Sequence, residues 1–223
     1  GYLKDYELLK LDPERWDCEP VHTAESMLKM WRGGDISPTD GQSGASVMQP
    51  SPLTKPHPPL FLATSSPDGV AYAAKNGFPL QHYFAMPVEM RVKIEQSYQA
   101  CQPSENEINH MHSLIVIVGR NEAQLRERLE ASLIESFKGG DWPKVPQAAE
   151  RHIEGRPVDI DLTAKARYAA ANAIVGPIES VQAQLDAFIE KTGAKRLVLY
   201  MEAIADAATT RSSIEHFAEH ILH

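Results

Sequence analysis

The residues best suited to chemistry in this sequence are three consecutive hydroxyl side chains, Thr64, Ser65 and Ser66, which we call the hydroxyl turn. They follow a short apolar run at residues 60–63 and precede a Pro-Asp pair, which is typical of the first turn of a helix. A turn of this kind directs hydroxyl and backbone N–H groups to one point, as in the phosphate sites of α/β proteins. A serine that only caps the helix would give the same pattern, so both interpretations stay open.

Histidines are the second group that could bind a ligand. His216, His220 and His223 recur at helical spacing, and two histidines four residues apart can chelate a metal. No HExxH motif and no carboxylate partner accompany them, so we predict no metal site. His110 and His112 flank the start of a predicted strand, which is the opposite end from the chemistry of α/β barrels.

Two further ionisable residues lie on or beside predicted strands. His82 falls inside a strand, and we favour a buried position in the core over contact with a ligand. Glu202 follows the last predicted strand and is the best candidate for a catalytic carboxylate. The alternative is that Glu202 forms an ion pair with a Lys or Arg across the mouth of the fold.

The composition narrows the class of protein. The 223 residues are 43% hydrophobic, which is enough to bury a core, and the net charge of −8 argues against a nucleic-acid partner. No apolar run approaches the roughly 20 residues of a membrane helix, so we expect no membrane partner. Cys18 and Cys101 are lone cysteines far apart, which predicts a reducing compartment and a cytoplasmic protein.

Strands alternate with helices along much of the chain. The patterns predict strands over residues 60–63, 80–84, 111–118 and 196–201, and helices from Pro67 and over residues 87–100, 122–137, 178–192 and 212–222. This order predicts parallel βαβ units, in a doubly wound sheet or a (β/α)₈ barrel. Residues 35–57 and 139–170 are rich in Pro and Gly and are expected to be irregular, apart from a brief half-exposed strand at residues 158–162.

Both folds place the active face at the carboxyl ends of the strands. The predicted strand ends are residues 64–68, 83–86 and 119–121 and Glu202. No GxGxxG motif follows any of these strands, which weakens the case for a dinucleotide site.

Several landmarks occur in the order typical of bacterial luciferase and the luciferase-like flavin monooxygenases, which the chain resembles. They are Gly1 with Lys4-Asp5-Tyr6, Glu25 with Trp31, Leu62-Ala63-Thr64-Ser65-Ser66, Gly77-Phe78-Pro79, Val175-Gly176-Pro177-Ile178-Glu179, Thr192-Gly193 and Tyr200-Met201-Glu202-Ala203. The resemblance implies a (β/α)₈ TIM-type barrel, of which residues 1–223 form one domain with about the last four βα units. The N-terminal portion and the family's catalytic histidine would then lie upstream of Gly1.

The resemblance also implies a cofactor. It would be FMN, used in its reduced form with O₂ by a monooxygenase that acts on a small organic substrate. The hydroxyl turn would lie at the phosphate and Phe84 against the flavin ring, with ordinary core packing as the alternative for Phe84. Residues 139–170 would form a lid-like insertion that excludes water, and Lys165 and Tyr168 match residues of the family's lid.

The chain departs from luciferase within the landmark at the hydroxyl turn, with Thr64 in place of Glu and Asp68 in place of Thr. An Asp that faces a phosphate is unfavourable, so we expect Asp68 to turn toward helix N–H groups or solvent. The change at Thr64 keeps open a non-catalytic flavin-binding protein or a scaffold subunit of a heterodimer. A deazaflavin- or nicotinamide-using reductase on the same barrel is a third hypothesis.

The expected partners follow from the same resemblance. They are a small-molecule substrate, a flavin reductase that supplies reduced FMN, and further subunits in a homo- or hetero-oligomer. Four βα units alone would leave two open sheet edges and an exposed apolar interior, which favours association.

Overall fold

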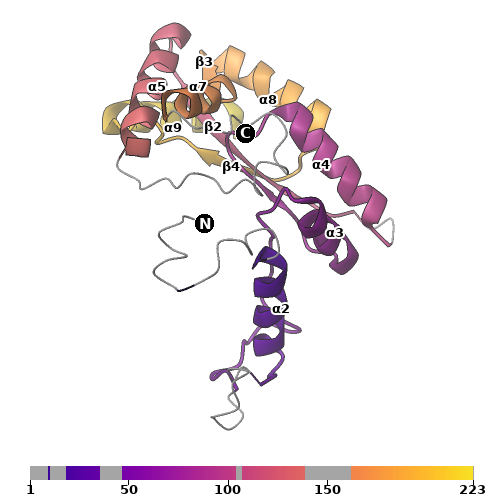
Figure 1. Cartoon of the computed structure of the whole chain (residues 1–223). Helices are drawn as coiled ribbons and strands as arrows, with labels where there is room; N and C mark the ends of the chain where they lie inside the picture. The colour runs from indigo at the N-terminus through magenta and orange to yellow at the C-terminus, as the bar shows by residue number, and fades with distance from the viewer. Residues whose placement is uncertain (1–9, 11–18, 36–46, 104–106, 139–161, 223) are drawn as a thin grey trace.

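The computed structural model describes residues 10, 19–35, 47–103, 107–138 and 162–222. Helices and parallel strands alternate along these residues (Figure 1). In chain order the elements are α2 (Glu19–Trp31), α3 (Pro67–Asn76), β1 (Gln81–His82), α4 (Val88–Cys101), β2 (Met111–Val118), α5 (Glu122–Lys138), α7 (Leu162–Ala171), β3 (Ile174–Gly176), α8 (Ile178–Thr192), β4 (Leu197–Tyr200) and α9 (Ala207–Ile221).

The sheet is parallel throughout. His112 of β2 pairs with His82 of β1 on one edge and with Leu197 of β4 on the other. β3 joins the carboxyl end of β2 at residues 116–118, and Leu62 forms an isolated parallel bridge with Leu80 just before β1. The bridge, β1, β2 and β4 therefore lie side by side, and β4 pairs directly with β2 although β3 lies between them in the sequence.

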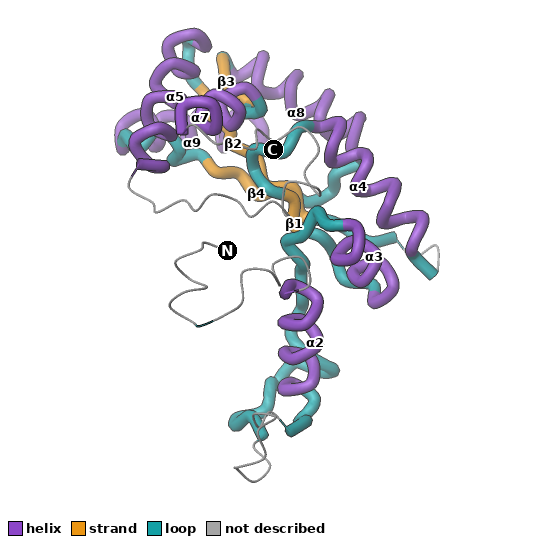
Figure 2. The backbone as a smooth tube through the Cα atoms, in the orientation of Figure 1, coloured by secondary structure: helices purple, strands orange, loops and turns teal. Residues whose placement is uncertain are grey.

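The strand at the centre of the sheet is β2 (Figure 2), and its apolar run at residues 114–118 is buried on both faces. Leu114, Val116 and Val118 pack with buried residues of α8 and α9. Ile115 and Ile117 point the other way, into a cluster with buried residues of α5 and α7. A strand covered on both faces needs no polar alternation, which explains the unbroken apolar run in the sequence.

A second apolar cluster holds the N-terminal elements together. Ala73 and Ala74 of α3 are fully buried, and they share this cluster with Leu62, Leu80 and Tyr98. α2 contributes Ala24 and Leu28 to it and packs Trp31 against it, although the body of this helix projects away from the sheet (Figure 1). Gly77 ends α3 with φ of 68°, a left-handed conformation that favours glycine.

A buried arginine fastens α4 to the sheet. Arg91 is fully buried, and its guanidinium donates to three carbonyl oxygens, those of Tyr83 and Met86 after β1 and of Ser113 in β2, at 2.8–2.9 Å. Its Cζ also lies 5.3 Å from the ring centre of Phe188 in α8. Burial lowers the pKa of Arg91 to about 10, which still leaves the side chain charged at neutral pH.

The structure corrects several boundaries. The strand predicted at residues 60–63 is reduced to the bridge at Leu62, because the described residues provide a neighbour on only one side of it. α9 begins at Ala207 rather than at Ser212, because the Asp206 side chain accepts a hydrogen bond from the N–H of Thr209 and caps the helix there. β3 was not predicted as a strand.

The region expected to be irregular over residues 139–170 is also shorter than predicted. Residues 162–171 form α7, and Ala166, Ala169 and Ala170 are buried against α5. The strand expected at residues 158–162 and most of the expected lid lie outside the described residues. No helix among the described residues is long and apolar enough to cross a membrane.

Arg91→Ala should lower the free energy of unfolding by at least about 3 kcal/mol, because three buried carbonyl groups lose their donor. Arg91→Lys should recover only part of this loss, since an ammonium group cannot reproduce the planar guanidinium fork. Urea denaturation measures both. Lys93→Ala, at an exposed position of the same helix, should stay within about 0.5 kcal/mol of the parent. Equal effects at the two positions would contradict the role given to Arg91.

Candidate functional site

The candidate site lies at the carboxyl edge of the sheet. Because the bridge at Leu62 and strands β1, β2 and β4 run parallel, the segments that follow them emerge at the same edge. These segments are residues 64–68, 83–86 and 119–121 and Glu202. The sequence therefore predicted correctly which segments share an edge.

The hydroxyl turn forms the start of α3. Ser66 Oγ accepts a hydrogen bond from the N–H of Gly69 at 3.2 Å, and Ser66 is the N-cap of the helix. Thr64 Oγ1 lies 3.2 Å from Ser66 Oγ and accepts a hydrogen bond from the N–H of Ser66 at 3.3 Å. The interpretation of Ser66 as the helix cap is confirmed. Thr64 holds Ser66 in position through these two contacts.

Close packing at the turn leaves no room for a side chain at Gly69. A Cβ atom there would lie 2.3 Å from Thr64 Oγ1 and 2.9 Å from Ser66 Oγ. Real Cβ atoms do not approach other atoms so closely, so a larger residue would push both hydroxyl groups out of place. The observed shape of the hydroxyl turn therefore requires glycine at residue 69.

Ser65 is the member of the turn that remains available. Its side chain is half-buried and makes no hydrogen bond to the described residues, whereas Thr64 and Ser66 bond to each other. The turn stands at the positive end of α3, where an anion is favoured. Asp68 is exposed in the first turn of the helix, as expected, and so can face solvent rather than the anion. The donor set therefore fits a phosphate group bound mainly through Ser65.

Aromatic side chains line the neighbouring part of the edge. The ring centres of Tyr83 and Phe84 are 4.2 Å apart, and Phe84 meets the ring of Tyr200 in β4 edge-on at 5.9 Å. Phe84 is half-buried against the cluster around Ile117, so it belongs to the core and still presents part of its ring. Tyr200 is 37% exposed on the same face. This surface could hold a flat ring system.

The other predicted site residues, Glu202, Lys165 and Tyr168, lie in two different segments of the chain. Glu202 is exposed and forms no ion pair among the described residues, so the alternative of a pair across the mouth is not observed there. Lys165 and Tyr168 lie on α7, and Tyr168 packs against the buried cluster of α5 and β2. The part of the expected lid that carries these two residues is therefore a packed helix.

The histidines separate into two groups. His82 is buried, as favoured from the sequence, and lies with His110 and His112 between the sheet and α4, toward the strand starts. His216 and His220 stand on α9, stacked on each other with ring centres 6.3 Å apart and exposed to solvent. His223 is outside the described residues.

The parallel strands and the helices that cover them define a protein of the α/β-barrel type, a fold whose ligands bind at the carboxyl ends of the strands. The luciferase-like monooxygenase family model matches residues 22–196, and the chain belongs to this family. The fold and the family expected from the landmarks are therefore confirmed. A search of curated proteins finds no match.

Solved structures with the same fold include three with informative descriptions. They are the FMN complex of the oxygenating constituent of 3,6-diketocamphane monooxygenase from Pseudomonas putida (14% identity, TM-score 0.56), Flavoprotein 390 (16%, 0.52), and an F420-dependent secondary alcohol dehydrogenase with an F420–acetone adduct (16%, 0.50). The similarity covers 90%, 90% and 85% of this chain. It covers 61%, 86% and 58% of those chains, so this chain spans less than two thirds of the monooxygenase and the dehydrogenase.

Ser66→Ala should lower the free energy of unfolding by about 1 kcal/mol, because α3 loses its N-cap acceptor. Ser65→Ala should change it by less than about 0.5 kcal/mol, because Ser65 makes no hydrogen bond to the described residues. Urea denaturation of the two variants, side by side, tests this separation of roles. A larger loss for Ser65→Ala than for Ser66→Ala would show that the capping residue has been misassigned.

Proposed function

We propose that this chain belongs to an FMN-dependent monooxygenase that uses reduced FMN and O₂ to oxidise a small organic substrate. The observation that carries the proposal is the hydroxyl turn, which begins α3 with one available hydroxyl at the carboxyl edge of a luciferase-like fold. In this reading Ser65 and the positive end of α3 hold the phosphate, while Thr64 and Ser66 keep the turn in shape.

The aromatic surface would serve the other end of the cofactor. Phe84 and Tyr200 would pack against the flavin ring and keep water away from one of its faces. Bound FMN would supply the electron transfer and the activation of O₂, which no protein side chain provides. Glu202, which is exposed at the same edge, would contact a polar group of the substrate. Lys165 and Tyr168 would border the lid formed by the rest of residues 139–170.

The similar structures support a flavin-type cofactor, but they do not all contain the same one. The diketocamphane monooxygenase structure contains FMN, and the alcohol dehydrogenase structure contains F420. We favour FMN because the family model describes monooxygenases and the turn suits a terminal phosphate. A deazaflavin-dependent reductase on the same fold is the alternative that the dehydrogenase supports.

A non-catalytic flavin-binding protein, or a scaffold subunit, is the second candidate function. Flavoprotein 390, whose length this chain largely spans, supports the flavin-binding part of this alternative by its name. The replacement of the Glu expected in luciferase by Thr64 favours it as well. Oxygen consumption with reduced FMN separates the two functions, because only a monooxygenase or oxidase consumes O₂ in a protein-dependent manner.

The proposed partners are a flavin reductase, a small-molecule substrate and further subunits. The inner face of β4 supports the last of these, since Val198 is 40% exposed and Tyr200 37% exposed. In a parallel sheet the side chains of paired residues share a face, so the half-buried Ser113 of β2 continues this surface, whereas Ile115 further along is fully buried. Additional barrel strands, from the same or another chain, would cover it.

Titration with oxidised and reduced FMN, followed by flavin absorbance and fluorescence, tests the proposal. We expect saturable binding that Ser65→Ala weakens about tenfold or more, because one hydrogen bond to a charged group contributes roughly 1.5–3 kcal/mol. Ser97→Ala, on the exposed side of α4, is the matched control and should bind as the parent does. Equal FMN affinity in the parent, Ser65→Ala and Ser97→Ala would show that Ser65 does not contact the cofactor. Absence of any flavin binding would contradict the proposed function itself.

A further inference from the structure

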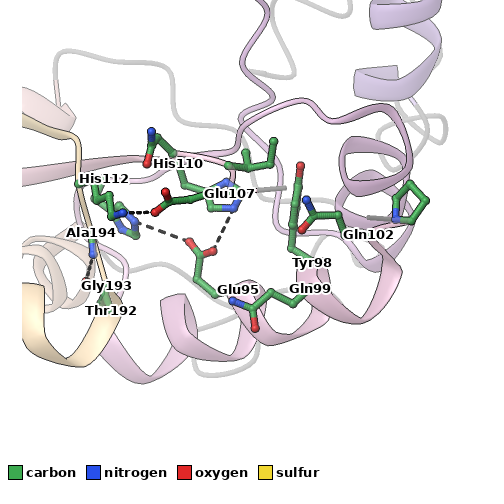
Figure 3. Close-up of a pocket in the computed structure, with 14 residues that line it drawn as sticks. Glu95, Tyr98, Gln99, Gln102, Glu107, His110, His112, Thr192, Gly193 and Ala194 are labelled. Carbon is green, nitrogen blue, oxygen red and sulfur yellow. Dashed lines mark hydrogen bonds and ion pairs between the residues drawn. The ribbon is translucent and has the colours of Figure 1, made fainter. Parts of the chain in front are cut away.

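Glu95 of α4 lies close to three buried histidines, His82, His110 and His112. Figure 3 shows Glu95 with two of them, His110 and His112. Its Oε1 lies 2.8 Å from His82 Nε2 and 3.6 Å from His112 Nε2, and its Oε2 lies 3.1 Å from His110 Nε2. His82 and His112 are paired neighbours on β1 and β2, so both side chains leave the sheet on the face that α4 covers. The cluster is near the strand starts, away from the hydroxyl turn.

The hydrogen bonds assign a distinct role to His110. The backbone N–H of Leu80 donates to His110 Nδ1 at 2.9 Å, so this nitrogen is an acceptor and carries no proton. In the neutral ring the proton is then on Nε2, which donates to Glu95 Oε2. His110 therefore positions the carboxylate, and its Nε2 has no lone pair for a ligand.

The remaining donor atoms have the spacing of a metal site. One ligand atom each from His82, Glu95 and His112 lies within 4.8 Å of the other two. Ligand atoms about 2.0–2.1 Å from a tetrahedral zinc ion are roughly 3.3 Å apart. The two printed separations from Glu95 Oε1, 2.8 and 3.6 Å, lie on either side of that value. Small side-chain shifts would therefore bring the three atoms into coordination.

We propose that His82, His112 and Glu95 bind one divalent transition-metal ion, with zinc as the favoured metal. Two imidazoles and one carboxylate are a donor set that zinc accepts, with a fourth position left for water. This site is separate from the proposed flavin site and does not depend on it. Because its ligands come from β1, β2 and α4, a bound ion would link the helix to two strands.

Access to the ion would come through a pocket of about 570 Å³ that Glu95, His110 and His112 help to line (Figure 3). The far wall is formed by residues 192–195 between α8 and β4. Glu107 also lines the pocket, at its exposed rim, where it pairs with Lys195. Water and small ions can therefore reach Glu95, whose side chain is 13% exposed, without opening the core.

A neighbouring positive charge limits how tightly this site can bind a metal ion. Arg91 is a fully buried cation one turn before Glu95 on the same helix, and it disfavours a second positive charge beside it. We therefore expect weaker binding than in structural zinc sites built from thiolates.

The test must first remove the surface histidines of α9, since His216 and His220 could chelate zinc on their own. In a protein with His216→Ala, His220→Ala and His223→Ala, calorimetric titration with Zn²⁺ should give one site per chain. Zn²⁺ should also raise the melting temperature relative to EDTA. Glu95→Gln should abolish both effects, whereas Glu107→Gln, on the rim of the same pocket, should leave them unchanged.

Two results would overturn the proposal. One is the absence of a saturable site once the surface histidines are removed, and the other is unchanged zinc binding in Glu95→Gln. If Glu95→Gln does not fold, Co²⁺ titration of the triple-alanine protein decides instead. Strong visible absorption typical of a four- or five-coordinate Co²⁺ ion supports the site, and the weak spectrum of hydrated Co²⁺ excludes it.

Discussion

The structure depends on how two charged residues, the fully buried Arg91 and the largely buried Glu95, fix α4 to the sheet. Arg91 satisfies carbonyl groups after β1 and within β2, and Glu95, one turn further along the helix, accepts from His110. Each charge stabilises the other, since Glu95 raises the pKa of Arg91 and Arg91 lowers that of Glu95, both against the larger effect of burial. An isolated charge in either place would be costly, and the pair makes the docking of α4 specific.

The parallel register then determines what the fold can do. It brings the hydroxyl turn, Phe84 and Glu202 to one edge although more than a hundred residues separate the first from the last. It also divides the side chains of each strand between two environments. Ser113 and Val198 face the inner side of the sheet, whereas His82 and His112 face α4.

The sequence predicted the elements whose signals are local. The apolar run of β2 and the periodicity of α4, α5 and α8 are local patterns, and the Ser-Pro-Asp sequence marks the start of α3 whatever surrounds it. The packed helix α7 was missed because an alanine-rich segment next to Pro and Gly looks irregular until α5 is there to bury it. The roles of Arg91 and Glu95 were missed because they exist only once strand pairing has placed their partners.

α4 also connects the two ends of the strands, the carboxyl end near Phe84 and the amino end near the histidines. Its first turn follows the segment that carries Phe84, and Arg91 holds the carbonyl of Tyr83 next to it. One turn later the same helix presents Glu95 to the histidines at the opposite end. A ligand at either end that displaces the helix would be allosteric for the other end, and the two binding free energies would then be coupled by the same amount in both directions.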